Sequence, residues 1–318
     1  MTAGRDDHER DGISFSHLDQ ELFDGAGVTK HELVDYLDVM ADRLIPVLRD
    51  RPLSTVRVRA GQAPFMQKNL PSYAPDWIPR VDVWSHASQR TVSYALGNDR
   101  RTLLWFANQR AVEYHVPLSA GEDWRYPTHA VLDLDPPTAD RFDQVVRVAL
   151  LARQVLRESG LDGAVKTSGS KGLHIYIPVR EEIVEDVAAA TRALAARVER
   201  LDPGVATTAF LREERAGRVL VDASRAGGAT VVAAYSPRAR PGLPVSFPVA
   251  WADLDRITPA EFTIRTVPQI LDGRDPWAQA MPSPQRLPAD LVAEGHRIPI
   301  ARVAAMHAGK RRKRGAGA

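Results

Sequence analysis

The spacing of apolar residues predicts a helix near the start of the chain and several short strands after it. From Thr29 to Leu44, apolar residues recur every three or four positions, which is the period of one helical face. Thr29 and Glu32 have the spacing of a capping box, so the helix is expected to begin there and to end before Pro46. Short β-branched or alternating segments bounded by Gly, Pro or Asn are expected to be strands, at 55–59, 80–84 and 91–96.

Strands and helices alternate in the second half of the chain. The expected strands are 130–135, 164–167 and 174–178, and the expected helices are 138–159 and 182–201. Two further apolar segments, 218–222 and 230–235, are predicted to form a hairpin around Gly227 and Gly228. This half is therefore expected to be a sheet covered by two helices, with a proline-rich wrapping from Pro237 onward.

These patterns together predict a mixed α/β (α+β) fold with one domain over residues 13–300. We expect an N-terminal α/β module at about 13–125 and a catalytic core at about 126–300. Residues 1–12 are expected to be a flexible lead-in. Residues 301–318, which end in KRRKRGAGA, are expected to be a disordered basic tail.

Composition narrows the functional classes. The chain has no cysteine, which excludes disulfides, thiolate zinc sites and cysteine nucleophiles, so any metal must bind to carboxylates or imidazoles. The net charge of +2 does not by itself predict a nucleic-acid partner. No apolar run approaches the roughly 20 residues of a membrane span, and the first residues are too polar for a secretory signal. We therefore expect a cytoplasmic protein that does not bind membranes.

Two aspartates end one of the predicted strands. Asp133 and Asp135 are two positions apart, so both side chains leave the same face while Leu132 and Leu134 enter the core. Two carboxylates held this close are unfavourable unless a cation neutralises them, and their oxygens suit Mg²⁺ or Mn²⁺. An isolated Asp-x-Asp pair is nevertheless more often a solvated strand end than a metal site.

A third aspartate strengthens the metal interpretation. Asp222 closes another apolar segment, VLVD. Three acids at strand ends could hold two metal ions, which clamp the attacking and leaving oxygens in phosphoryl transfer. The sequence therefore favours a two-metal site over a solvated strand end.

A glycine-rich loop lies between these acids in the sequence. The segment KTSGSKGLH spans 166–174, and its glycines allow backbone amides to approach an anion. It lacks the spacing of a Walker loop, and a strand follows it instead of a helix. Taken alone it could equally be an ordinary hairpin turn. Beside the acids it is expected to bind a triphosphate, with cationic donors from Lys171, His174, Arg238 and Arg240.

The whole set of motifs resembles the polymerase domain of bacterial ligase D in non-homologous end joining, within the archaeo-eukaryotic primase superfamily. The matching segments run in order from residue 15 to residue 278: FSH, LFDGAGVTK, RPLS, PSYAPDWIP, EYHVP, DLDPP, KTSGSKGLH, VLVD, AYSPRARPG, FTIRTVP and DPWA. The resemblance implies a primase-polymerase catalytic core with an RRM-like sheet, packed with an N-terminal α/β module. It also implies filling of DNA gaps or ends, commonly with manganese and with a preference for ribonucleotides.

The resemblance assigns roles to single residues. Two ions, Mn²⁺ or Mg²⁺, are expected on the positions that match the family's metal ligands, Asp133, Asp135 and Asp222. Nucleotide contacts are expected from Ser168, Lys171, His174 and Arg238, with His115 of EYHVP near the sugar. Lys30 matches a lysine that grips the 5′-phosphate of the downstream strand, and Phe65 matches an aromatic residue that stacks on the template.

Three positions depart from the family pattern. Gln20 stands where a second phosphate-gripping lysine is common, and Met66 follows Phe65 where a second phenylalanine is common. After Asp222 the chain continues Ala-Ser-Arg, where the family often has Trp, Ser and a polar residue. We therefore expect weaker phosphate anchoring, weaker template stacking and an altered wall of the nucleotide pocket.

The resemblance also implies partners. The expected substrates are NTP or dNTP and DNA with a gap or a 5′-phosphorylated end. Nothing in the chain resembles a ligase or a nuclease, so we expect a stand-alone polymerase associated with the nucleoid, which depends on a Ku-type end binder and a separate DNA ligase. The basic tail could add DNA affinity through counterion release.

Three other functions account for part of the sequence. A polymerase-β-type transferase would place a Gly-Ser turn before the acidic pair, whereas Gly169 and Ser170 follow it. A transferase that binds a nucleotide-sugar through Asp-x-Asp would not explain Lys30 or Asp222. The alternative of another class is a catalytically idle DNA-end binding scaffold, which would bind DNA without metal and extend no primer.

Overall fold

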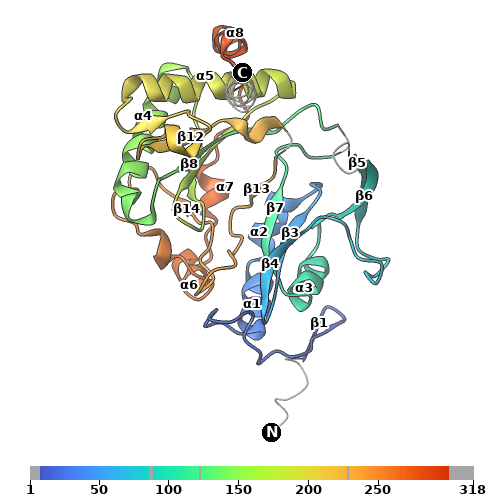
Figure 1. The fold of residues 1–318 in the computed structure, drawn as a ribbon. Helices are drawn as coiled ribbons and strands as arrows, with labels where there is room; N and C mark the ends of the chain where they lie inside the picture. Colours follow the sequence, from blue (N-terminus) through green and yellow to red (C-terminus); the bar gives the residue numbers. More distant parts are fainter. Residues whose placement is uncertain (1–7, 86–88, 122, 228, 301–318) are drawn as a thin grey trace, which may run out of the picture.

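The chain is built around two main sheets (Figure 1). The computed structural model describes residues 8–85, 89–121, 123–227 and 229–300. A four-stranded sheet belongs mainly to the N-terminal half, and a six-stranded sheet belongs to the C-terminal half. The predicted mixed α/β fold is therefore confirmed.

Part of the expected N-terminal lead-in is ordered. Strand β1 (Glu9–Arg10) pairs with β2 (Ile13–Ser14), and Arg10 forms ion pairs with Asp35 at 2.6 Å and Asp38 at 3.1 Å. These contacts tie the start of the described chain to the first helix. The remainder of the expected lead-in, 1–7, and the expected basic tail, 301–318, lie outside the described residues.

The N-terminal sheet has the strand order β13-β7-β3-β4. Its strands are β3 (Ser54–Arg59), β4 (Gln62–Gln67), β7 (Ala111–Val116) and β13 (Val231–Val232). Three helices accompany it: α1 (Lys30–Val39), α2 (Ala41–Leu48) and α3 (Arg100–Asn108). A separate hairpin consists of β5 (Arg80–Ser85) and β6 (Arg90–Ala95). The three strands predicted in this half are confirmed, whereas β4, β7 and α3 were not predicted.

The first predicted helix is correct at its beginning and wrong at its end. Both hydrogen bonds of the Thr29–Glu32 capping box are present. The helix breaks at Met40, however, and a second helix continues through Pro46 to Leu48. Pro46 removes one backbone donor, but Leu44, Ile45 and Leu48 bury their side chains in the core. That burial offsets the missing hydrogen bond, so the proline does not end the helix.

The C-terminal sheet has the strand order β11-β12-β8-β10-β9-β14. In chain order, its central unit is β8 (His129–Asp135), α4 (Phe142–Glu158), β9 (Ala164–Thr167), β10 (Leu173–Pro178), α5 (Val184–Leu201) and β12 (Val219–Asp222). Neighbouring strands of this unit are antiparallel. The connection and the order β12-β8-β10-β9 are those of an RRM-like sheet, as expected. The short strands β11 (Ala206–Thr207) and β14 (Pro248–Val249) extend it on either side.

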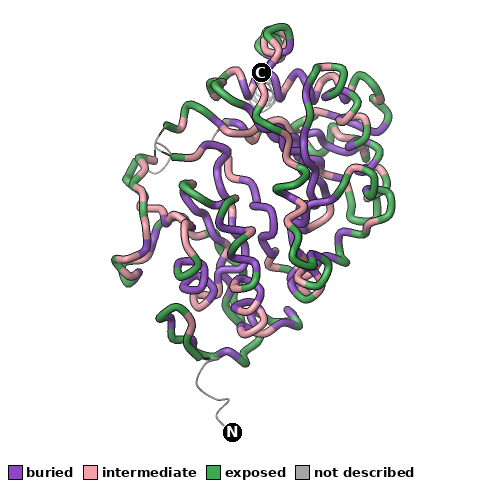
Figure 2. The backbone as a smooth tube through the Cα atoms, turned by 180° about the vertical axis from the view of Figure 1, so that it is seen from behind, coloured by how far each residue is buried: buried purple, intermediate pink, exposed green. Residues whose placement is uncertain are grey.

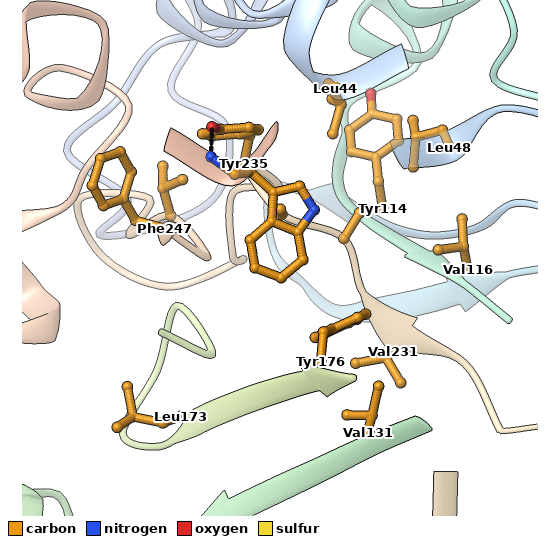
Figure 3. Close-up of a cluster of buried hydrophobic side chains, with 14 of the residues drawn as sticks. Leu44, Leu48, Tyr114, Val116, Val131, Leu173, Tyr176, Val231, Tyr235 and Phe247 are labelled. Atoms are coloured by element: carbon orange, nitrogen blue, oxygen red, sulfur yellow. Dashed lines mark hydrogen bonds between the residues drawn. The ribbon is translucent and has the colours of Figure 1, made fainter. Parts of the chain in front are cut away.

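The two faces of this sheet have different neighbours. Helices α4 and α5 pack on one face, as predicted, and both contact β8 and β12. The opposite face turns toward the N-terminal sheet, and Figure 3 shows Val131 of β8 and Tyr176 of β10 close to Val231 of β13. A single hydrophobic cluster runs through both halves, and buried backbone follows the strands of both sheets in Figure 2. The two halves therefore share one core.

The predicted hairpin around Gly227 is wrong. Strand β12 pairs with β8 and β11, whereas β13 pairs with β7 in the other sheet. A short 3₁₀ helix, η4 (Ser224–Gly227), lies between β12 and β13, and Gly228 lies outside the described residues. Each apolar segment thus joins a different sheet, and the valines of both segments are buried there.

The remaining elements belong to the C-terminal half. They are η2 (Ala139–Arg141), η3 (Arg212–Glu214), η5 (Pro259–Glu261), α6 (Val267–Leu271), α7 (Pro276–Ala280) and α8 (Ala289–Arg297). Of these, α7 packs against β14 and α8 packs against α5. Helix α8 lies on α5 so closely that a Cβ atom at Gly295 would meet the Ala189 carbonyl oxygen at 1.8 Å. Within the described residues, no helix has the length and apolar character that a bilayer span requires.

Candidate active site

A row of polar residues crosses the C-terminal sheet on the face opposite α4 and α5. The strand register pairs Asp222 with Asp133, Asp133 with His174, and His174 with Lys166. Residues directly opposite one another on antiparallel strands point to the same side. Asp135, two positions after Asp133 on β8, also points to this side. The structure thus brings the three predicted acids together on one face, although 87 or more positions separate Asp222 from the other two in sequence.

Arg225 lies between two of these acids. Its guanidinium donates to Oδ2 of Asp133 through Nε at 3.1 Å and through Nη2 at 2.6 Å. The same Nη2 is 3.4 Å from Oδ2 of Asp222. The sequence marked Arg225 only as a departure from the family pattern, although its place three residues after a strand-end acid was a usable signal.

The acids differ in their tendency to ionise. Burial disfavours the charged form of Asp133, but His174 and Arg225 outweigh it and hold the pKa of Asp133 below its usual value. Burial and the neighbouring charge of Asp133 raise the pKa of Asp135. Asp133 and Asp135 therefore repel each other, and a cation bound between them would relieve that repulsion.

The acids have the chemistry to bind a divalent ion, but within the described part of the chain they are not already arranged around a common ion position. Carboxylate oxygens are the ligands that Mg²⁺ and Mn²⁺ prefer. Among the residues that the structure describes, no three His, Cys, Asp or Glu side chains are already grouped so as to hold an ion. The guanidinium of Arg225 lies between Asp133 and Asp222, at 2.6 Å from Oδ2 of Asp133 and 3.4 Å from Oδ2 of Asp222. An ion would fit this donor set once Arg225 has moved.

His174 links the acids to a buried lysine. Its Nε2 is 3.3 Å from Oδ1 of Asp133, and its Nδ1 is 2.9 Å from Nζ of Lys166. Lys166 also contacts Oγ of Ser246 at 2.5 Å. Burial, followed by the charge of Lys166, lowers the pKa of His174 to about 4. Burial, followed by the charge of Arg238, lowers the pKa of Lys166 well below its usual value. At neutral pH we therefore expect His174 to be a neutral donor beside the acids.

The glycine loop between β9 and β10 is shaped by close backbone contacts. A Cβ atom at Gly172 would lie 2.1 Å from the Leu134 carbonyl oxygen, so only glycine fits next to the strand that carries the acids. Gly169 has φ +66 and packs against the side chain of Arg238. The hydroxyl of Ser168 accepts from the amides of Ser170 at 3.3 Å and Gly172 at 3.1 Å. The loop is therefore held closed by its own serine.

The two cations predicted beside this loop are anchored on opposite sides of it. Lys171 donates to the carbonyl oxygen of Pro136, directly after the acidic strand, at 2.8 Å. Arg238 donates to the carbonyl oxygen of Ser168 at 2.7 Å. Arg240, also predicted, is exposed to solvent. Lys171 and Arg238 thus flank the loop with positive charge.

Glu113 orients two of the predicted nucleotide contacts. Its carboxylate lies 2.7 Å from Nε2 of His115 and 3.0 Å from Nε of Arg238, and it accepts from the amide of Ala239 at 2.9 Å. Burial opposes ionisation of Glu113, but the hydrogen bond with His115 and the charge of Arg238 outweigh it and lower the pKa to about 2. The sequence analysis missed Glu113, although it lies two positions before His115 and therefore on the same face of β7.

Lys30 lies in a second basic cluster, within the N-terminal half. It is 2% exposed, and its ammonium donates to the Ser16 carbonyl oxygen and to Oδ1 of Asn108, both at 2.6 Å. Burial, followed by the charge of Arg110, lowers the pKa of Lys30 to about 8. Arg110 is more exposed and donates to Oε1 of Gln20 at 2.5 Å. A cation thus stands beside Gln20, where the sequence suggested that one was lacking.

Phe65 is an exposed aromatic residue on β4. It is 37% exposed, and the guanidinium carbons of Arg57 and Arg59 each lie 5.8 Å from the centre of its ring. Met66 beside it is 47% exposed. An aromatic face flanked by arginines can stack on a nucleobase. All the contacts described for Phe65 and Lys30 are with residues of the N-terminal half. Neither residue belongs to the network around the acids.

The sequence and the fold of this chain are similar to those of known proteins. Residues 29–277 match the family model described as LigD, primase-polymerase domain. The "Bifunctional non-homologous end joining protein LigD" of Bacillus subtilis is 33% identical over 261 residues, which cover 80% of this chain and 42% of the relative. The "Multifunctional non-homologous end joining protein LigD" of Mycolicibacterium smegmatis is 32% identical over 289 residues, which cover 87% of this chain and 36% of the relative. The chain thus spans less than half the length of these relatives.

A solved structure agrees with these sequence matches. The polymerase domain from Mycobacterium tuberculosis Ligase D, in complex with DNA, is similar to this chain with a TM-score of 0.74 and 31% sequence identity. The similarity covers 85% of this chain and 99% of that domain. It therefore includes both sheets and not only the acidic face.

Proposed function

This chain belongs to the LigD primase-polymerase family, and on that premise we propose that it adds nucleotides to primer 3′ ends at gaps or breaks in DNA. The observation that carries the proposal is the convergence of Asp133, Asp135 and Asp222 on one face of the sheet, beside a glycine loop flanked by cations. Acids next to an anion-binding loop provide what nucleotidyl transfer requires.

The three aspartates are the proposed ligands of two divalent ions, Mn²⁺ or Mg²⁺. Ions bound there would lower the pKa of the primer hydroxyl and neutralise charge on the triphosphate. Contacts with His174 and Arg225 keep Asp133 ionised against the effect of burial, and burial and the charge of Asp133 raise the pKa of Asp135. A bound cation would relieve the repulsion between these two carboxylates, which supports cation binding at this face.

The glycine loop and its flanking residues are the proposed triphosphate site. Lys171 and Arg238 approach from opposite sides of the loop, and Ser168 holds its amides in place. His174 would donate from beside Asp133, and the exposed Arg240 would contact the outer phosphates. His115, held by Glu113, is placed to contact the sugar. A preference for ribonucleotides is part of the proposal and is tested by the extension assay below.

The N-terminal half supplies the proposed DNA contacts. Phe65, with Arg57 and Arg59 beside its ring, would stack on a template base. Lys30 would bind the 5′-phosphate of the downstream strand. Arg110 would supply the second cation there, since its guanidinium reaches Gln20 and affects the pKa of Lys30. The DNA-bound state of the similar mycobacterial domain supports DNA as the partner.

The names of both relatives refer to non-homologous end joining. Non-homologous end joining requires end binding and ligation, so we propose a Ku-type protein and a DNA ligase as partners at the nucleoid.

An extension assay on gapped DNA tests the proposed function. It compares substrates with and without a 5′-phosphate, NTP with dNTP, and Mn²⁺ with Mg²⁺. We expect Asp133→Ala combined with Asp135→Ala to lower incorporation at least about a hundredfold, the order reported for single preorganised charge-stabilising groups. Exposed Asp140→Asn is the matched control and should keep full activity. DNA binding that is indifferent to metal, with no primer extension by the unaltered chain, would instead identify an idle end-binding scaffold.

A further inference from the structure

Both acids that face each other across β8 and β12 have all their oxygens engaged by the protein. For Asp133, Oδ1 lies 3.3 Å from Nε2 of His174 and Oδ2 accepts from Arg225 at 2.6 Å. For Asp222, Oδ1 accepts from the amide of Ser224 at 2.8 Å, and Oδ2 lies 3.4 Å from Arg225. A guanidinium thus takes the position between the two carboxylates that a bridging cation requires.

The charges of Asp133, Asp222 and Arg225 are consistent with a guanidinium that takes the place of a metal ion. Asp133 and Asp222 face each other in register, so their repulsion must be compensated in the folded chain. Arg225 cannot lose its proton at any ordinary pH, and its pKa is raised by Asp133 and Asp222 against the effect of burial. It therefore provides permanent compensation in the absence of another cation.

The position of Arg225 in the fold allows it to move. It is partly exposed and lies in η4, the short 3₁₀ helix that directly follows the acidic end of β12. Its guanidinium contacts are with the acids, so leaving them requires a change of side-chain rotamer rather than a rearrangement of the sheet. A divalent ion carries twice the charge of a guanidinium and can compete for the same oxygens.

We propose that Arg225 is a built-in counter-ion that occupies the metal site and must be displaced before Asp133 and Asp222 bind a divalent cation. This inference rests on the proposed metal site. Arg225 stabilises the ionised Asp133 and Asp222 in the absence of metal, and the same contacts lower the affinity of this site for a metal ion. The apparent affinity for the ion is then lower than the intrinsic affinity by the fraction of molecules in which Arg225 has left.

Direct binding of Mn²⁺, measured by titration calorimetry without nucleotide or DNA, tests the proposal. We expect Arg225→Gln to bind Mn²⁺ on the order of tenfold more tightly than the unaltered chain, if Arg225 holds the site closed about nine-tenths of the time. Arg225→Lys, which keeps the charge but loses the planar fork, should lie between the two. Arg218→Gln is the matched control. Arg218 lies just before β12, its side chain is 25% exposed against 29% for Arg225, and it pairs with Glu199 instead.

Thermal unfolding provides a second readout. Without metal, Arg225→Gln leaves Asp133 and Asp222 facing each other unneutralised, so its Tm should fall below that of the unaltered chain. Saturating Mn²⁺ should raise the Tm of the variant more than that of the unaltered chain. A variant that bound Mn²⁺ no more tightly than the unaltered chain would overturn the inference and leave the metal site standing. Failure of both proteins to bind Mn²⁺ would overturn the metal site as well.

A measurement on the unaltered chain keeps the inference testable if Arg225→Gln does not fold. The Nε–H resonance of Arg225 can be followed by NMR during a titration with diamagnetic Mg²⁺. We expect it to shift as the ion enters and the hydrogen bonds to Asp133 break. An Arg225 resonance that does not change while Mg²⁺ saturates the site would contradict displacement.

Discussion

At the scale of single residues, one buried carboxylate contacts two of the charged or titratable side chains of the proposed nucleotide site. Glu113 contacts His115, Arg238 and the amide of Ala239, and these contacts lower its pKa to about 2 from an ordinary value of 4.5. A depressed carboxyl pKa stabilises the folded chain above the unfolded pKa. That stabilisation is lost as the pH falls from about 4.5 toward 2.

We therefore expect Glu113→Gln to destabilise the chain at pH 6 and much less at pH 2.5. The difference corresponds to at most about 3 kcal/mol of the free energy of unfolding. Urea unfolding at the two pH values measures it, with the exposed Glu261→Gln as control. An equal effect at both pH values would show that the charge of Glu113 is not what stabilises the site.

Arg110 gives a second prediction at this scale. Its guanidinium reaches Gln20 and affects Lys30, so we expect Arg110→Ala to reduce the preference for 5′-phosphorylated gapped DNA about tenfold to a hundredfold, the effect of losing one charge-assisted contact. Adding Gln20→Lys should restore the preference by returning a cation to the cluster. Binding to phosphorylated and unphosphorylated DNA measures the ratio, and exposed Arg212→Ala serves as control. A preference unchanged by Arg110→Ala would remove Arg110 from phosphate recognition.

At the scale of elements, the glycine loop depends on how tightly it passes the acidic strand. A Cβ atom at Gly172 would lie 2.1 Å from a backbone oxygen of β8, which no side-chain rotation can relieve. We expect Gly172→Ala to lower the free energy of unfolding by about 2–4 kcal/mol, the upper range for overpacking and backbone strain. Gly204→Ala is the matched control, because its Cβ would meet only a flexible side-chain atom at 3.4 Å. Urea unfolding that treated the two variants alike would contradict this prediction.

Local signals in the sequence predicted several elements correctly because the physics that forms them is local. The capping box at Thr29 and the alternation that placed Asp133 and Asp135 on one face needed only neighbouring residues. Pairing of β12 with β8, and of β13 with β7, depends on which distant edge is free. Local apolar patterns carry no such information, so the hairpin around Gly227 was wrong.

Contacts between distant residues of the candidate site were likewise not predictable from local patterns. Arg225 was within reach of the sequence, since it lies three residues after Asp222. The contact of Arg110 with Gln20 spans 90 positions and has no local signal. Pro46 shows the opposite error, because a strong local rule was overridden by burial of Leu44, Ile45 and Leu48 in the tertiary core.

At the scale of the whole molecule, the two halves hold each other together. Strand β13 completes the N-terminal sheet, Tyr36 donates from α1 to the Tyr235 carbonyl oxygen at 2.7 Å, and the Gly242 amide donates to the Ala26 carbonyl oxygen at 2.9 Å. All of these contacts join residues before position 126 to residues after position 230. We therefore expect the two halves to unfold as one cooperative unit.

We expect a fragment comprising residues 1–125 not to fold stably alone, because it lacks β13 and exposes the shared core. Near-UV circular dichroism of the fragment should show little fixed aromatic signal, whereas the complete chain should unfold in one transition. Mixing the fragment with residues 126–318 is the control, since association should restore the signal. A fragment that unfolds cooperatively by itself would show that the N-terminal module is independent.

The ion pair between Glu113 and Arg238 bears on how such proteins can be recombined. One partner comes from the N-terminal sheet, and the other follows β13 and supports the glycine loop of the C-terminal sheet. A chimera that takes its C-terminal sheet from one relative and its N-terminal sheet from another would take the two partners of this contact from different proteins. We therefore expect a transplanted glycine loop to keep its supporting ion pair only if β7 is transplanted with it.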